Sequence, residues 1–197
     1  MIPRLVALMR IQSACLAGIA LCVATAATAE ETVIDFEQVA IRLDPKNDEA
    51  VNRLERYVEK GVEFKLARQP ERSKARGRIM FFPHIASGRK GILNAMASEQ
   101  QIPVQARFPN GASAVTIVFW ASTGASAKLE AFDSKGEVVA RDELKVVPRR
   151  KKPEEPVPTF ELKVNAEEIS YVEFSGPRTG EYLVADEVRF IPLKAAR

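Results

Sequence analysis

Short segments in which apolar and polar residues alternate make up most of the chain beyond residue 30. Alternation with a period of two places one set of side chains on each face of a strand, and Gly, Pro, Asn and Asp separate the segments as turn residues do. The pattern predicts strands at residues 32–37, 62–66, 78–82, 113–123, 127–132, 137–147, 160–164, 169–174 and 182–192. Such a series of short strands is typical of an antiparallel sandwich, so we expect an all-β protein.

The segment 113–123 carries the strongest strand signal. Ile117 and Phe119 on one face alternate with Val118 and Trp120 on the other, so both faces are largely apolar. Strands of this kind are buried on both sides. We therefore expect this strand near the centre of the sheet. For Trp120, this favours burial in the core over an exposed position.

A tight turn is predicted between the segments 127–132 and 137–147. Asp133 stands first and Gly136 fourth in the intervening sequence DSKG. These are the preferred positions of the two residue types in a β-turn. The two segments should therefore form a hairpin.

One segment has helical spacing. Val51, Leu54 and Tyr57 recur at intervals of three, Asp48 suits the cap in front of them, and Gly61 suits a helix end. We therefore expect one short helix, from Asp48 through Tyr57, near the N-terminus of the mature domain.

Two polar stretches, at about residues 69–77 and 148–158, are predicted to be exposed loops. The second reads PRRKKPEEPVP and has too few backbone amides to lie inside a sheet. Its four cations suit contact with an anionic polymer or a membrane surface. Glu154 and Glu155 follow them closely, which favours a solvated loop instead.

The first 29 residues have the pattern of a cleavable secretory signal. Arg4 and Arg10 form a basic start, an apolar stretch spans residues 11–23, and Ala27-Thr28-Ala29 suits the cleavage site. The apolar stretch is shorter than the ~20 residues that span a bilayer. We expect cleavage after Ala29, a secreted or periplasmic product, and no stable membrane insertion afterwards.

Removing the signal changes the composition of the chain. Cys15 and Cys22 both lie within it, so residues 30–197 contain no cysteine and offer no disulfide or thiolate nucleophile. The whole chain has 29 basic and 26 acidic residues, and 27 basic ones remain without Arg4 and Arg10. Near neutrality and export both argue against a nucleic-acid partner. The length suits a single domain over residues 30–197.

Several short motifs carry a family resemblance. They are VIDFE at 33–37, GVEF at 61–64, AFDSKG at 131–136, ISYVEF at 169–174 and VADEVRF at 184–190. In this order they resemble the secreted bacterial jelly-roll β-sandwiches of the galactose-binding-like, carbohydrate-binding-module type. The resemblance implies an antiparallel jelly-roll sandwich and a non-catalytic module that often binds carbohydrate.

The same resemblance implies a structural calcium ion where the first and last strands meet. Glu37 and Asp186 occupy the matching positions. Calcium takes several oxygen ligands, and here the second motif is Asp186-Glu187 instead of two aspartates, without an acidic Gly-rich loop beside it. The alternative interpretation is that Asp35, Glu37 and Asp186 are simply polar residues at strand ends.

Catalytic groups are scarce in the sequence. His84 is the one histidine, and no GxSxG elbow for a serine nucleophile occurs. A pair of carboxylates is enough for glycoside hydrolysis, and Asp35 and Glu37 would share one strand face. We expect no enzyme, with a glycoside hydrolase-like activity as the third candidate function.

Exposed aromatic rings are the residues that stack on sugars, and three are candidates for ligand binding: Trp120, Tyr171 and Tyr182. Tyr171 and Tyr182 lie near predicted strand ends, from which their hydroxyls reach solvent. The leading hypothesis is a secreted, non-catalytic module that binds a glycan or another cell-envelope component. The alternative is a structural or protein-interaction role in the periplasm or extracellular matrix.

Overall fold

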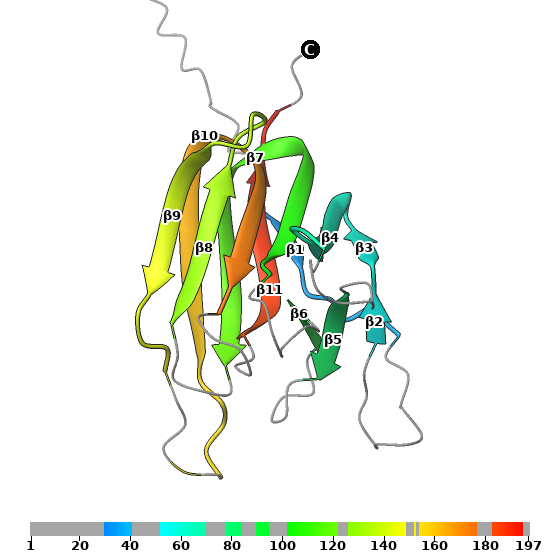
Figure 1. Ribbon diagram of the computed structural model, residues 1–197, viewed down its shortest axis with the longest axis vertical. Helices are drawn as coiled ribbons and strands as arrows, with labels where there is room; N and C mark the ends of the chain where they lie inside the picture. Colours follow the sequence, from blue (N-terminus) through cyan, green and yellow to red (C-terminus); the bar gives the residue numbers. More distant parts are fainter. Residues whose placement is uncertain are drawn as a thin grey trace, which may run out of the picture.

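The computed structural model describes residues 30–40, 52–69, 78–83, 90–94, 102–121, 126–148, 152, 154–176 and 183–194. All regular structure in these residues is strand, and every strand pair is antiparallel (Figure 1). The strands are β1 (Thr32–Ile34), β2 (Asn52–Leu54), β3 (Arg56–Glu59), β4 (Val62–Leu66), β5 (Ile79–Pro83), β6 (Lys90–Asn94), β7 (Val104–Ala121), β8 (Ala127–Phe132), β9 (Val138–Leu144), β10 (Thr159–Ser175) and β11 (Leu183–Pro192). The all-β, antiparallel prediction is confirmed, and the jelly-roll connectivity stays a prediction.

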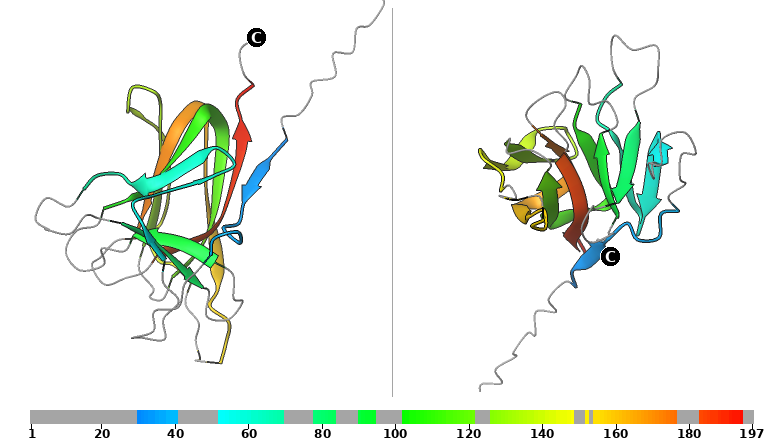
Figure 2. Two further views of the ribbon diagram at one scale, coloured as in Figure 1. Left: turned by 90° about the vertical axis from the view of Figure 1, so that its right-hand side faces the viewer. Right: turned by 90° about the horizontal axis from the view of Figure 1, so that it is seen from below.

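The two long strands β7 and β10 run through both halves of the sheet. The start of β7 pairs with β4 and the end of β10, whereas the rest of β7 pairs with β11 and the start of β10. Gly111, with a φ of +72°, lies in β7 between these two stretches. Figure 2 shows both long strands arching from one half to the other.

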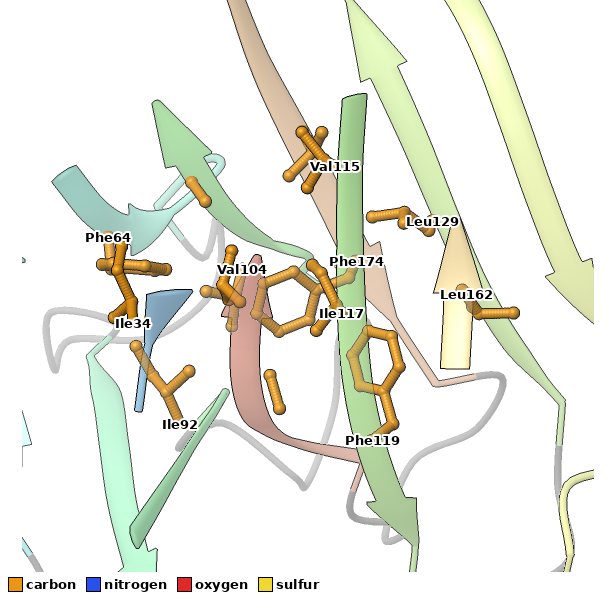
Figure 3. Packing of buried hydrophobic residues seen from close by; sticks show 14 of the residues in the cluster. Ile34, Phe64, Ile92, Val104, Val115, Ile117, Phe119, Leu129, Leu162 and Phe174 are labelled. Carbon is orange, nitrogen blue, oxygen red and sulfur yellow. The ribbon is translucent and has the colours of Figure 1, made fainter. Parts of the chain in front are cut away.

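We call the two halves layer one and layer two. Layer one has the order β3-β4-β7-β10-β8-β9, and layer two joins β2, β5, β6 and β1 to β11 and the remaining halves of β7 and β10. Apolar side chains from both layers form one buried cluster (Figure 3). Phe119 in β7 is fully buried there and contacts Phe160 and Phe174 at the two ends of β10.

The predicted helix is wrong where the structure describes it. Residues 52–54 form β2 and residues 56–57 begin β3, whereas residues 48–51 lie outside the described part. Lys60 and Gly61 both have positive φ, as a two-residue turn between β3 and β4 requires, and Tyr57 turns inward to pack on Phe64 and Phe81. Gly61 therefore closes a hairpin. In the sequence alone, a glycine in such a turn looks the same as a glycine that ends a helix.

Strand β6 was not predicted, because its start, Lys90-Gly91, resembles a turn. Gly91 is instead the point at which β6 approaches β11. A Cβ atom on Gly91 would lie 2.4 Å from Val184 Cγ1 and 2.9 Å from the carbonyl oxygen of Ala185. The missing side chain is therefore what allows this strand to pack so closely.

Gly91→Ala should lower the free energy of unfolding by about 1–3 kcal/mol, because the added methyl group overpacks the contact between β6 and β11. Urea unfolding measures the change. Val184→Ala in the same background removes one of the two clashes and should recover part of the loss. An unchanged unfolding midpoint for Gly91→Ala would contradict the close approach of the two strands.

Candidate binding face

The outer face of layer one carries two rows of side chains that cross all six strands. Residues directly opposite one another on neighbouring strands point to the same face. The first row, which we call the aromatic row, consists of Val58, Glu63, Arg107, Tyr171, Phe132 and Val138. The second, which we call the charged row, consists of Arg56, Lys65, Gln105, Glu173, Glu130 and Arg141.

An aromatic pair lies at the middle of the aromatic row. The rings of Phe132 and Tyr171 stack with centroids 4.7 Å apart and planes 6° from parallel. The guanidinium carbon of Arg107 lies 4.8 Å from the centroid of the Tyr171 ring, within the range of a cation–π contact. The three side chains come from three adjacent strands and form a partly exposed platform.

The turn between β8 and β9 lies beside this platform. The Asp133 carboxylate accepts hydrogen bonds from the backbone amides of Lys135 and Glu137, each 2.9 Å long. Gly136 takes a positive φ of 84°, and a Cβ there would lie 3.5 Å from the Tyr171 hydroxyl. The predicted turn is confirmed, and it places backbone next to the Tyr171 hydroxyl.

Two carboxylates on this face are neutralised by neighbouring cations. Glu63 binds Arg56 at 2.6 Å and Lys65 at 2.9 Å, and the hydrogen bond from Lys65 is the main reason that the Glu63 pKa is lowered. Glu130 binds Lys128 and Arg141, each at 2.6 Å. Burial works against ionisation of Glu130, yet these two cations hold its pKa below the ordinary value.

Glu173, directly opposite Glu130, has a different environment. Gln105 Nε2 donates to its carboxylate at 3.2 Å, and among the described residues it forms no ion pair. Burial raises the pKa of Glu173, and the negative charge of Glu130 adds to this effect. Glu173 is therefore the carboxylate of the charged row that retains free acceptor capacity.

The pKa of Glu173 is raised and that of Glu63 is lowered, so replacing these two residues should change the stability in opposite directions. A carboxyl whose pKa is raised by folding stabilises the protein below its ordinary pKa, and this contribution is lost as the pH rises through the folded value. Glu173→Gln should therefore raise the Tm by about 2–4 °C at pH 7, with no gain at pH 4. Thermal unfolding at both pH values measures the effect.

Glu63→Gln is the matched control, since the Glu63 pKa is lowered. A lowered pKa contributes stability above the ordinary value, which is lost as the pH falls through the folded pKa. This variant should therefore have a lower Tm at pH 7 and a small difference in acid. The same direction of change for both variants at pH 7 would contradict the two environments.

A hollow opens at the end of this face where β7 and β8 begin and β10 ends. Glu173 and Ser175 line it from β10 and Lys128 from β8. Its remaining polar lining includes Arg68, Ser126 and Glu143. The hollow thus holds two cations, two carboxylates and two hydroxyls beside the charged row.

Of the predicted ligand-binding residues, the structure places Tyr171 on this face. It lies within β10, not at a strand end, so its ring is presented across the sheet. Trp120 is 2 % exposed and packs with Met80, Leu93 and Val184, away from layer one. The predicted burial of Trp120 is confirmed, and its ring is not presented as a sugar platform. Tyr182 lies outside the described residues.

The predicted calcium ligands have other contacts in the structure. Glu37 accepts a hydrogen bond from the Lys90 amide at 3.0 Å, and its carbonyl oxygen accepts one from Lys90 Nζ. Asp186 is 3 % exposed at an irregularity of β11. The described residues hold no group of three potential metal-binding side chains. Calcium binding stays a prediction, and the proposed function does not depend on it.

Sequence reasoning missed most of the candidate face. Arg107 comes from β7, and Glu130 and Phe132 come from β8, so these residues lie far from Tyr171 in the sequence. The hairpin turn at Asp133 fixes the position of Phe132 relative to β9. The pairing of β8 with the end of β10 is what brings Phe132 to Tyr171, and no local pattern encodes it.

Comparison with known proteins adds to this geometry. No family model and no curated protein matches the chain. A cleaved adhesin domain of Lys-gingipain from Porphyromonas gingivalis is similar in structure, with 12 % identity, a TM-score of 0.45, and coverage of 73 % of this chain and 98 % of that one. A DUF4465 family protein from Bacteroides caccae has 9 % identity and a TM-score of 0.47, covering 83 % of this chain and all (100 %) of that one.

A family 29 carbohydrate-binding module from Piromyces equi is also similar, with 6 % identity, a TM-score of 0.38, and coverage of 72 % of this chain and 89 % of that one. The structural neighbours thus include a carbohydrate-binding module and an adhesin domain. In the described part of the chain, no helix has the length and apolar character to cross a membrane.

Proposed function

We propose that this protein is a secreted, non-catalytic module that binds a glycan on the outer face of layer one. The observation that carries the proposal is the partly exposed Phe132–Tyr171 stack, with Arg107 over the Tyr171 ring, in the middle of the outer face. A sugar has apolar C–H faces and a rim of hydroxyls. The partly exposed rings offer apolar contact to the C–H faces, and the adjoining charged row suits the rim.

The dimensions of the face support an extended ligand. The aromatic row crosses six strands, so it spans about 24 Å, since neighbouring strands lie about 4.8 Å apart. Tyr171 and Glu173 are two positions apart on β10, or about 7 Å. One sugar unit on the rings therefore has a neighbour within reach of the charged row.

A protein partner is the second candidate. Val138 and Val139 are 50 % and 40 % exposed on β9, the last strand of layer one. Apolar side chains on an edge strand favour pairing with another chain. This version places the partner on β9 and does not require the aromatic platform.

A hydrolase is the third candidate, because Glu130 and Glu173 are directly opposite each other and their pKa values shift in opposite directions. Glu130 is bound by two cations, which suits a structural role better than attack on a sugar. Products released from a bound oligosaccharide and detected by mass spectrometry would favour this candidate over binding alone.

A glycan array probed with residues 30–197, with and without calcium, tests the proposal. Binding to at least one oligosaccharide and its loss in Tyr171→Ala are expected. The calcium arm separates the proposed module from a metal-dependent one. No binding to any glycan under either condition would overturn the carbohydrate function.

A further inference from the structure

Glu173, which lines the hollow beside the charged row, can accept further hydrogen bonds. Glu63 and Glu130 each bind two cations, whereas Glu173 accepts one hydrogen bond from Gln105. An ionised carboxylate has about four acceptor sites. Glu173 lines the hollow, so its remaining sites are available to a ligand there.

The other groups of the hollow complement this acceptor. Arg68 is exposed and donates only, while the hydroxyls of Ser126 and Ser175 donate or accept. Lys128 binds Glu130 at 2.6 Å and is already neutralised. A ligand with several hydroxyls, each both donor and acceptor, satisfies such a mixed set better than an ion of either sign.

We propose that this hollow binds one sugar unit of a neutral glycan, with two adjacent hydroxyls donating to the Glu173 carboxylate, and that it rejects sugars carrying a carboxylate. The inference rests on the proposed function, because it assigns a sugar class to one end of the same face. A uronic acid would bring its charge next to Glu173 and Glu143, and like charges in a partly desolvated site repel.

The protonation state of Glu173 controls this contact. The ionised form accepts two hydroxyl donors, whereas protonation converts one oxygen to a donor. Affinity should therefore fall on acidification through the raised Glu173 pKa. The titratable and charged groups that face Glu173 are Glu130 and Lys128 from β8, Arg68 beyond β4, Glu143 from β9, and Tyr171 on β10 itself, with the neutral Gln105 on β7.

The test uses an array in which each uronic acid oligosaccharide is paired with its carboxyl-reduced, neutral counterpart. The wild type should bind the neutral member of a pair about tenfold more tightly or better. Glu173→Gln should lower that affinity by about tenfold to a hundredfold and remove its pH dependence between pH 4 and 7. Glu161→Gln, an exposed carboxylate on layer two and outside the hollow, should change it by less than about threefold.

The outcomes separate the inference from the proposed function. Glycan binding that survives Glu173→Gln with its pH profile unchanged, or a preference for the uronic acid members, would overturn the inference and leave the glycan module intact. Absence of binding to every oligosaccharide would overturn both. Thermal unfolding of Glu173→Gln confirms that a loss of affinity does not reflect a loss of fold.

Discussion

Phe119→Ala is expected to lower the free energy of unfolding by about 3–5 kcal/mol, measured by urea denaturation. Phe119 is fully buried and contacts Phe160 and Phe174, which lie at opposite ends of β10. Because β10 runs through both layers, the cavity would weaken the contact between them. The size of the loss reflects the removal of a complete ring from a site bordered by other rings.

Phe132→Ala is the matched control, since Phe132 is half-buried on the outer face and has one stacking partner. Its replacement should cost about 1 kcal/mol. Equal losses for the two variants would show that the core is not centred on β7 and the two ends of β10.

Tyr171→Ala should weaken glycan binding at least about tenfold, because the central ring of the platform accounts for the stacking and supports both Phe132 and Arg107. Isothermal titration calorimetry with the tightest oligosaccharide from the array measures the loss. Tyr171→Phe keeps the ring and should stay within about threefold of the wild type.

Replacement of Arg107 and of Arg189 tests which of the two layers holds the glycan site. Arg107→Ala removes the cation over the Tyr171 ring and should also weaken binding. Arg189 is partly exposed on layer two, where it binds Glu187 and Glu161, and Arg189→Ala should leave the affinity unchanged. A weaker affinity in Arg189→Ala with an unaffected Arg107→Ala would move the site to the other layer.

The fold was predictable where local pattern and burial agree. Segments 62–66 and 127–132 form strands with those bounds, and Asp133 starts the turn that was expected. Prediction failed at β3, where Tyr57 has helical spacing but pairs as a strand, because its ring packs on side chains distant in sequence. It failed at β6 because a glycine in a close strand contact has the same sequence signature as a glycine in a turn.

The candidate site was predictable in one residue, Tyr171. Its partners Arg107 and Phe132 belong to strands 64 and 39 positions away, and their proximity follows from strand order. The sequence also does not distinguish Glu173 from the other glutamates. Glu173 differs from Glu63 and Glu130 because cations form ion pairs with those two carboxylates and, among the described residues, not with Glu173.

Nuclear magnetic resonance of the mature protein, titrated with the tightest oligosaccharide from the array, tests the central claim most directly. We predict that the backbone amide signals of Arg107, Phe132, Tyr171 and Glu173 shift with a common dissociation constant, while those of Glu161 and Arg189 on layer two do not. Shifts confined to layer two, or to the exposed valines of β9, would contradict a glycan site on the outer face of layer one.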